Sequence, residues 1–110
     1  GGRPVQWQTL KGTYPVRRRI EADLDSLPFP TREVVPLIRA VHDRYAVEIA
    51  RGCLQGCRFC QAGFIYRPYR ERNEEKILRF LQEGLRETGY DECSFLSLSA
   101  GDYSQIASLL

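Results

Sequence analysis

Residues 73–89 read NEEKILRFLQEGLRETG, a stretch in which apolar residues recur at the spacing of a helix. Four apolar side chains share one side of that helix: Ile77, Leu78, Leu81 and Leu85. Asn73 precedes two acids and is the expected N-cap, and Gly89 supplies a left-handed C-terminal stop. The stretch therefore predicts a helix that packs by one face.

Two short apolar segments flank this helix. Tyr45–Ala50 (YAVEIA) alternates large apolar residues with small or acidic ones, which predicts a strand with two different faces. Cys93–Leu98 (CSFLSL) predicts a second strand, buried on both faces. Strand, helix and strand form one β-α-β unit with a right-handed crossover and parallel strands. One unit cannot bury a parallel sheet, so about five or more further strands are expected elsewhere in the intact protein.

Residues 51–72, between the first strand and the helix, show no periodicity and are interrupted by glycines and a proline. They predict a long loop. Five arginines stand in it against the single acid Glu71. This charge indicates a solvated basic loop or, alternatively, cations that neutralise an anionic cluster and substrate.

Residues 1–40 have a different composition, because they hold five of the six prolines, which break both helix and sheet. We interpret them as a connector with short extended pieces and a helical turn near Val34–Ala40, following a preceding domain. The run Arg17-Arg18-Arg19 is interpreted as a solvated linker. Residues 41–110 are the next domain, expected to be cut short because a helix that starts after residues 102–104 stops at the last residue. The missing Met also favours a chain cut from a longer reading frame.

Composition narrows the class of protein. With 110 residues, 43% of them apolar and 27% charged, the chain has the composition of a globular domain. No apolar run is long enough to span a membrane, and no signal-peptide pattern opens the chain, so a cytoplasmic protein without membrane contact is expected. The net charge of +2 does not decide whether nucleic acid is a partner.

The chemistry-bearing stretch is CLQGCRFC, residues 53–60. Its three thiols, Cys53, Cys57 and Cys60, lie at the end of the first predicted strand, and soft thiolates select zinc, copper or an iron-sulfur cluster. A structural zinc almost always takes four ligands, so three indicate a cluster with one open iron and hence catalysis.

The four cysteines also allow other roles, which the sequence disfavours. A zinc knuckle completed by His42 or Cys93 is disfavoured, because His42 lies before the first strand and Cys93 opens the second, both at the ends remote from the loop. Cys93 is instead expected to be a buried core thiol. A redox pair of Cys57 and Cys60 leaves Cys53 unexplained.

The spacing C-x3-C-x2-C, with an aromatic before the last cysteine, resembles the radical S-adenosylmethionine enzymes. Residues 42–110 resemble one subgroup whose N-terminal region resembles a cobalamin-binding domain. Three segments carry that resemblance: VEIARGC (47–53), QAGFIYRP (61–68) and LSLSAGDY (96–103). The segment DLDSLPFP (23–30) resembles the piece that joins this front domain to the barrel.

The resemblance implies a role for particular residues. Cys53, Cys57 and Cys60 match the ligands of a 4Fe-4S cluster whose open iron takes the amino and carboxylate groups of S-adenosylmethionine. Phe59 matches the aromatic position beside the adenine. Four residues lie where the family has a Gly-Gly-Glu-like stretch that holds the methionine amino group: Ser99, Ala100, Gly101 and Asp102. Here that stretch reads Ala-Gly-Asp.

The implied fold is a partial TIM-type barrel of six β/α units with its site at the C-terminal ends of the strands. The chain would supply the first unit and the start of the next, and would be inactive alone. The implied activity is reductive cleavage of S-adenosylmethionine to a 5'-deoxyadenosyl radical, on a substrate that the resemblance does not name; no catalytic residue is assigned. An electron donor such as a flavodoxin or ferredoxin is implied, and cobalamin could be held by a domain outside the chain.

Two further classes stay open. One is an electron-transfer protein whose cluster only stores an electron, although such clusters use four cysteines. The other is a zinc-binding module that contacts nucleic acid through the arginine-rich loop. Because parallel strands end at one edge of a sheet, the cysteine loop and Ser99–Asp102 are expected to meet there and share one ligand, with Asp102 accepting a hydrogen bond from an ammonium group.

Overall fold

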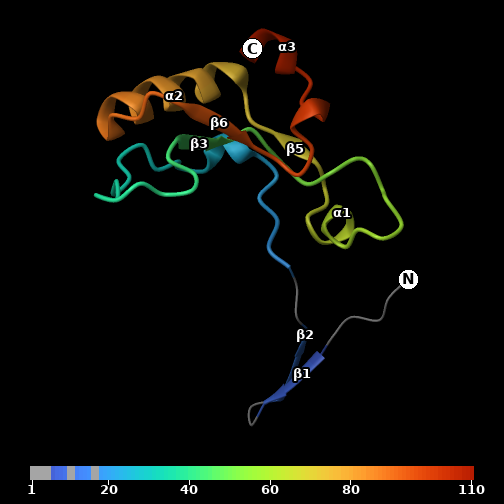
Figure 1. The fold of residues 1–110 in the computed structure, drawn as a ribbon. Helices are drawn as coiled ribbons and strands as arrows, with labels where there is room; N and C mark the ends of the chain where they lie inside the picture. Colours follow the sequence, from blue (N-terminus) through green and yellow to red (C-terminus); the bar gives the residue numbers. More distant parts are fainter. Residues whose placement is uncertain (1–5, 10–11, 16–17) are drawn as a thin grey trace.

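The computed structural model describes residues 6–9, 12–15 and 18–110. Strands β1 (Gln6–Thr9) and β2 (Gly12–Pro15) form an antiparallel hairpin at the end of the connector, away from the other elements (Figure 1). These are short extended pieces, as the sequence predicts. Arg17 lies outside the described residues.

The central unit is a parallel strand pair with a crossover helix. Strand β3 (Tyr45–Glu48) pairs with β6 (Cys93–Leu96) in a register that sets Tyr45 opposite Cys93 and Glu48 opposite Leu96. Helix α2 (Glu74–Thr88) connects them and lies along the pair in Figure 1. The predicted β-α-β order and the parallel pairing are confirmed.

Helix α2 begins and ends where its capping residues predict. The Asn73 side chain accepts a hydrogen bond from the Glu75 N–H (2.8 Å). Gly89 adopts φ 75° and its N–H donates to the Leu85 carbonyl (2.9 Å). The predicted apolar face is wrong at Leu78, which is 41% exposed, because Phe80 rather than Leu78 turns toward the strands.

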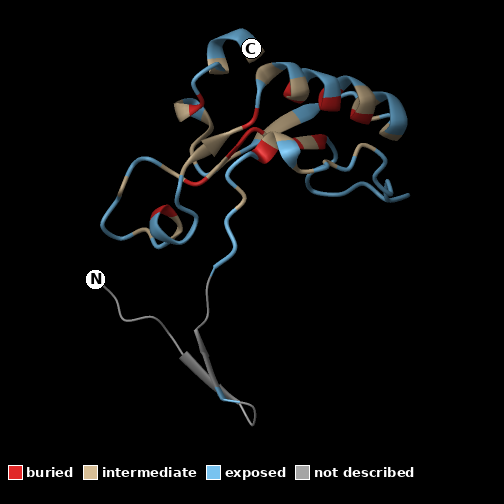
Figure 2. Ribbon diagram, turned by 180° about the vertical axis from the view of Figure 1, so that it is seen from behind, coloured by how far each residue is buried: buried red, intermediate tan, exposed pale blue. Residues whose placement is uncertain are grey.

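The core lies between α2 and the strand pair, where the buried residues gather in Figure 2. Alternate residues of the first strand face the helix, and Tyr103 closes the cluster from the C-terminal segment. Its members are Tyr45, Val47, Ile49, Ala50, Ile77, Phe80, Leu81 and Tyr103. Gly84 is required at this contact, since a Cβ there would stand 2.0 Å from the Tyr45 ring.

The structure corrects the predicted extent of the first strand and of the loop after it. The segment 45–50 is not one strand: after Ile49 the chain leaves β6, and β4 (Ala50–Arg51) pairs antiparallel with β5 (Arg70–Glu71). The intervening segment also contains a short helix, α1 (Ala62–Ile65). The loop prediction for 51–72 is therefore wrong at these places, because pairing across about twenty residues has no local periodicity.

Strand β6 differs from its prediction as well. It ends at Leu96, and it is not buried on both faces, since Leu96 and Leu98 are 51% and 48% exposed. Cys93 is exposed, so its prediction as a core thiol is wrong. The reason is that α2 covers one face of the pair only.

The remaining elements lie in the connector and in the C-terminal segment. A 3-10 turn, η1 (Leu24–Ser26), is hydrogen-bonded to Arg72 and to the start of α2, whereas the helical turn predicted near 34–40 does not form and that segment is exposed. After β6 come η2 (Ala100–Asp102) and α3 (Ile106–Leu109), so a helix does start after residues 102–104. Within the described residues, no helix combines the length and apolar character needed to cross a membrane.

Candidate functional site

Gly52 sets the entry to the cysteine loop. It adopts φ 99°, and a Cβ there would lie 2.8 Å from the Pro68 carbonyl oxygen and 2.9 Å from that of Tyr66. Only glycine combines this left-handed backbone with so close an approach. Sequence reasoning missed this role, since Gly52 stood out only as a break in the pattern just before Cys53.

The three cysteines lie on one exposed turn after β4. Cys53 and Cys60 are partly buried and Cys57 is exposed, all as free thiols. The Gln55 N–H points at the Cys53 sulfur (3.4 Å), and the Cys60 N–H donates to the Cys57 carbonyl (3.1 Å). Gly56, at φ 61°, reverses the chain between them.

The donor set fits a soft metal or a cluster by kind and number, since three thiols stand within eight residues. Their placement is not that of a closed site: across residues 18–110 and the hairpin strands, no three His, Cys, Asp or Glu side chains are gathered tightly enough to hold a metal ion. The prediction that these three thiols are metal ligands therefore rests on their chemistry and their spacing in the sequence.

The cysteine loop and the segment after β6 meet, as parallel strands predict. Gln55 Nε2 donates to Asp102 Oδ2 (2.7 Å), joining residues 47 apart in the sequence. This bond, with a second from Ser99, lowers the pKa of Asp102. Around Gly101 the space is open, because a Cβ there would meet no atom within 4 Å. Phe59 is 90% exposed on the loop.

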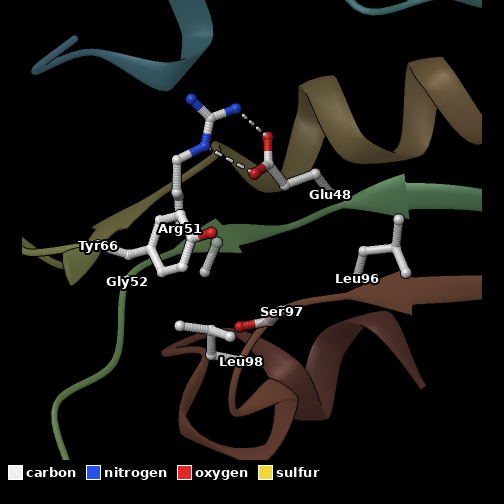
Figure 3. Close-up of a pocket in the computed structure, with 8 residues that line it drawn as sticks. Glu48, Arg51, Gly52, Tyr66, Leu96, Ser97 and Leu98 are labelled. Atoms are coloured by element: carbon white, nitrogen blue, oxygen red, sulfur yellow. Dashed lines mark hydrogen bonds and ion pairs between the residues drawn. The ribbon is translucent and has the colours of Figure 1, made fainter. Parts of the chain in front are cut away.

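A cavity of about 380 Å³ opens beside the ends of β3 and β6 (Figure 3). A bidentate ion pair lies in its wall: Arg51 Nε donates to Glu48 Oε1 (2.8 Å) and Arg51 Nη2 donates to Glu48 Oε2 (2.7 Å). The hydrogen bond to Glu48 raises the pKa of Arg51. The lining is otherwise largely apolar: Ala50, Gly52, Tyr66, Leu96, Ser97 and Leu98. The cavity could hold a small molecule next to the cysteine loop.

Glu71 ties the segment after β6 to β5. Its carboxylate accepts hydrogen bonds from the Ser104 N–H (2.8 Å), the Ser104 hydroxyl and the Tyr69 hydroxyl (2.8 Å). Burial alone would raise the pKa of Glu71, but these bonds outweigh it and leave the pKa lowered. Burial and the Glu71 carboxylate raise the pKa of Tyr69.

We expect the Glu71 contacts to make stability depend on pH. Because the folded-state pKa lies below the ordinary 4.5, the carboxylate stabilises the fold above that pH, and this contribution disappears as pH falls through the folded-state pKa. Glu71→Gln should lower the free energy of unfolding by about 1 kcal/mol at neutral pH. Between neutral and acid pH, the variant should then lose less stability than the parent does. Urea unfolding at pH 7 and pH 3 measures both, with Glu33→Gln as the control at an exposed acid. Identical pH profiles for parent and Glu71→Gln would contradict the assignment.

Comparison with known proteins gives one informative match. No protein-family model matches the chain. Over 100 residues, 91% of the chain, it is 35% identical to the uncharacterized protein MJ0966 of Methanocaldococcus jannaschii. The aligned part is 21% of that protein, so the chain spans about a fifth of the length of this relative. No solved structure matches.

Proposed function

We propose that the chain is the first part of a radical S-adenosylmethionine enzyme, in which Cys53, Cys57 and Cys60 hold a 4Fe-4S cluster. The observation that carries the proposal is the Gln55–Asp102 hydrogen bond. It joins the turn bearing the C-x3-C-x2-C motif to the Ala-Gly-Asp segment, so a single ligand can contact both. The exposed side chains of Leu96, at the end of β6, and of Leu98, just after it, also support a larger barrel that continues beyond this unit.

When bound, such a cluster supplies the electron for reductive cleavage of S-adenosylmethionine to a 5'-deoxyadenosyl radical. The residues of this chain bind and orient the cofactor. Asp102 is ionised at neutral pH, as an aspartate ordinarily is, and accepts a hydrogen bond from the methionine ammonium group. Gln55 holds that carboxylate toward the cysteine turn. Glu71, in β5, accepts from the Ser104 N–H and the neighbouring Tyr69 hydroxyl donates to the Asp102 carbonyl (3.4 Å), so both keep the segment in place.

The neighbouring cavity suits the remaining ligand atoms. It adjoins Gly52 and therefore the start of the cysteine turn, and its apolar walls exclude water from one side. Phe59, exposed on the same turn, is proposed to lie beside the adenine. An electron donor such as a flavodoxin or ferredoxin would reach the cluster over the exposed Cys57 side of the turn.

The proposal predicts that Asp102→Ala weakens S-adenosylmethionine binding while leaving the iron content intact. Loss of a charge-assisted hydrogen bond should reduce affinity roughly tenfold or more. Gly101→Val should weaken binding further, because it fills the open space beside Asp102. Titration of the reduced cluster's EPR signal with the cofactor, in the protein at its full natural length, measures both variants.

Asp91→Ala is the matched control, since Asp91 is an exposed acid after the C-terminus of α2, at the opposite end of the strand pair. It should bind as tightly as the parent. If Asp102→Ala and Gly101→Val also bind as tightly, the segment is only the end of a strand. An iron cluster that never responds to S-adenosylmethionine would instead indicate an electron-transfer protein.

A further inference from the structure

A second cavity, of about 310 Å³, lies where the connector passes the arginine-rich segment. Four arginines line it and come from three separate parts of the chain, the connector, β4 and β5. They are Arg18, Arg19, Arg51 and Arg70. The remaining lining residues are Ile20, Glu21, Ile65 and Tyr66. Arg18 and Arg19 are exposed, as the prediction of a solvated linker implies, and they also line this cavity.

Arg70 joins the connector to the segment before β5 through hydrogen bonds to backbone carbonyls. Its Nη1 donates to the Glu21 carbonyl (2.7 Å), its Nε to the Pro68 carbonyl (2.9 Å) and its Nη2 to the Tyr66 carbonyl (3.3 Å). Arg18 similarly donates to the carbonyl of Arg67. Backbone carbonyls fix both guanidinium groups in position and leave their positive charge in place, because a carbonyl is neutral.

Most of the positive charge of this cavity has no acidic partner. Among the described residues, Arg18, Arg19 and Arg70 form no ion pair, while Arg51 is paired with Glu48, which lines the neighbouring cavity. Glu21 is the one acid in the lining. Arg19 also makes no hydrogen bond within the described part of the chain, so its donors are free for a ligand. Concentrated positive charge in a concave site attracts anions.

We propose that this cavity binds the phosphate group of a phosphorylated small molecule. Guanidinium groups bind phosphate oxygens by paired hydrogen bonds, and several unpaired ones suit a group with more than one negative charge better than a single carboxylate. The volume is that of a small-molecule site. Ile20, Ile65 and Tyr66 provide an apolar wall for the organic part of the ligand.

The cavity adjoins the first one, and this position indicates how a bound ligand would extend. Arg51 and Tyr66 line both this cavity and the one beside the ends of β3 and β6, so the two cavities are neighbours. A molecule whose phosphate lies among the arginines extends past Tyr66 toward the first cavity. This inference concerns phosphate binding alone and holds whether or not the cysteines carry a cluster.

The test is calorimetric titration of inorganic pyrophosphate into the protein at its full natural length. The parent should bind it, and Arg19→Gln should weaken binding roughly tenfold or more without unfolding the chain, because Arg19 makes no bond that holds the fold. Arg39→Gln is the control, since it removes one charge from a connector residue that is also exposed and lies outside the cavity. It should bind like the parent.

Three results would overturn the proposal. The parent could fail to bind pyrophosphate, or Arg39→Gln could weaken binding as much as Arg19→Gln, which would mean a general effect of surface charge. A single-stranded RNA oligomer is titrated in parallel. If RNA displaces pyrophosphate, binds the parent more tightly and is weakened by Arg19→Gln, the arginines serve a nucleic acid and the small-molecule proposal fails.

Discussion

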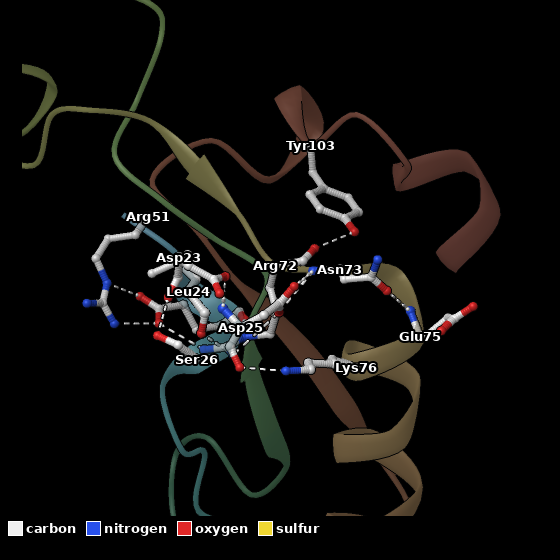
Figure 4. Close-up of polar contacts among 11 residues, drawn as sticks. Asp23, Leu24, Asp25, Ser26, Arg51, Arg72, Asn73, Glu75, Lys76 and Tyr103 are labelled. Atoms are coloured by element: carbon white, nitrogen blue, oxygen red, sulfur yellow. Dashed lines mark hydrogen bonds and ion pairs between the residues drawn. The ribbon is translucent and has the colours of Figure 1, made fainter. Parts of the chain in front are cut away.

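Replacing Arg72 with leucine is expected to lower the free energy of unfolding by about 3–5 kcal/mol, the range for removing one partner of a buried ionic cluster. Arg72 is only 2% exposed, and Figure 4 draws it among its polar contacts. Its Nη1 donates to the Leu24 carbonyl (2.7 Å) and its Nε to the Glu48 carbonyl (3.2 Å). Leucine would leave these carbonyls, and the nearby carboxylates of Asp25 and Glu48, without their buried partner.

The Arg72 guanidinium also lies against two aromatic rings, 5.7 Å from the Phe29 centroid and 5.3 Å from that of Phe80. Burial lowers its pKa, and Asp25 and Glu48 oppose that effect, so the group stays charged. Chemical unfolding of the full-length protein measures the loss. Arg86→Leu, at a 74% exposed side chain, is the control and should change stability by less than about 0.5 kcal/mol. A loss below about 1 kcal/mol for Arg72→Leu would contradict this account.

Asp25, beside Arg72, attaches the connector to the start of α2. The Asp25 carboxylate accepts from the Asn73 N–H (3.1 Å), and Lys76 Nζ donates to the Asp25 carbonyl (2.6 Å). Residues 23–26 are thus anchored to the start of α2 (Figure 4). Loss of Arg72 should loosen this end of the connector as well as the core.

Gly52→Ala is expected to have the second large effect, on the cysteine loop. The added Cβ would meet three backbone atoms, of Tyr66, Pro68 and Tyr69, at 2.8–2.9 Å, in a left-handed conformation that alanine rarely adopts. A cost of about 2 kcal/mol or more is expected, and the proposed cluster should assemble poorly. Unfolding and iron content measure both effects. Gly63→Ala, whose Cβ would meet nothing within 4 Å, should behave like the parent; equal behaviour of the two variants would contradict the role of Gly52.

Local patterns predicted the parts of the fold that depend on near neighbours. The caps at Asn73 and Gly89 need only the adjacent backbone, so the ends of α2 could be read directly. The parallel pairing followed from the order of the elements, and it placed the cysteine loop near Asp102, which Gln55 contacts.

Features that depend on distant partners could not be predicted in this way. The change of partner after Ile49 needs Arg72, whose N–H donates to the Ile49 carbonyl (2.8 Å), and no periodicity marks it. Gly52 is constrained by carbonyls fourteen or more residues away. Arg72 resembled the other loop arginines, and its burial arises only when the connector and α2 close around it. The same holds for the cavity that Arg19 and Arg70 line.

The most direct test of the proposed cluster is metal analysis of the anaerobically reconstituted protein. We predict about four irons per chain, held by three thiolates. Cys57→Ser should lose them, whereas Cys93→Ser should keep them, because Cys93 opens β6 at the end remote from the cysteine turn. One zinc and no iron per chain, or iron that survives Cys57→Ser, would contradict the account.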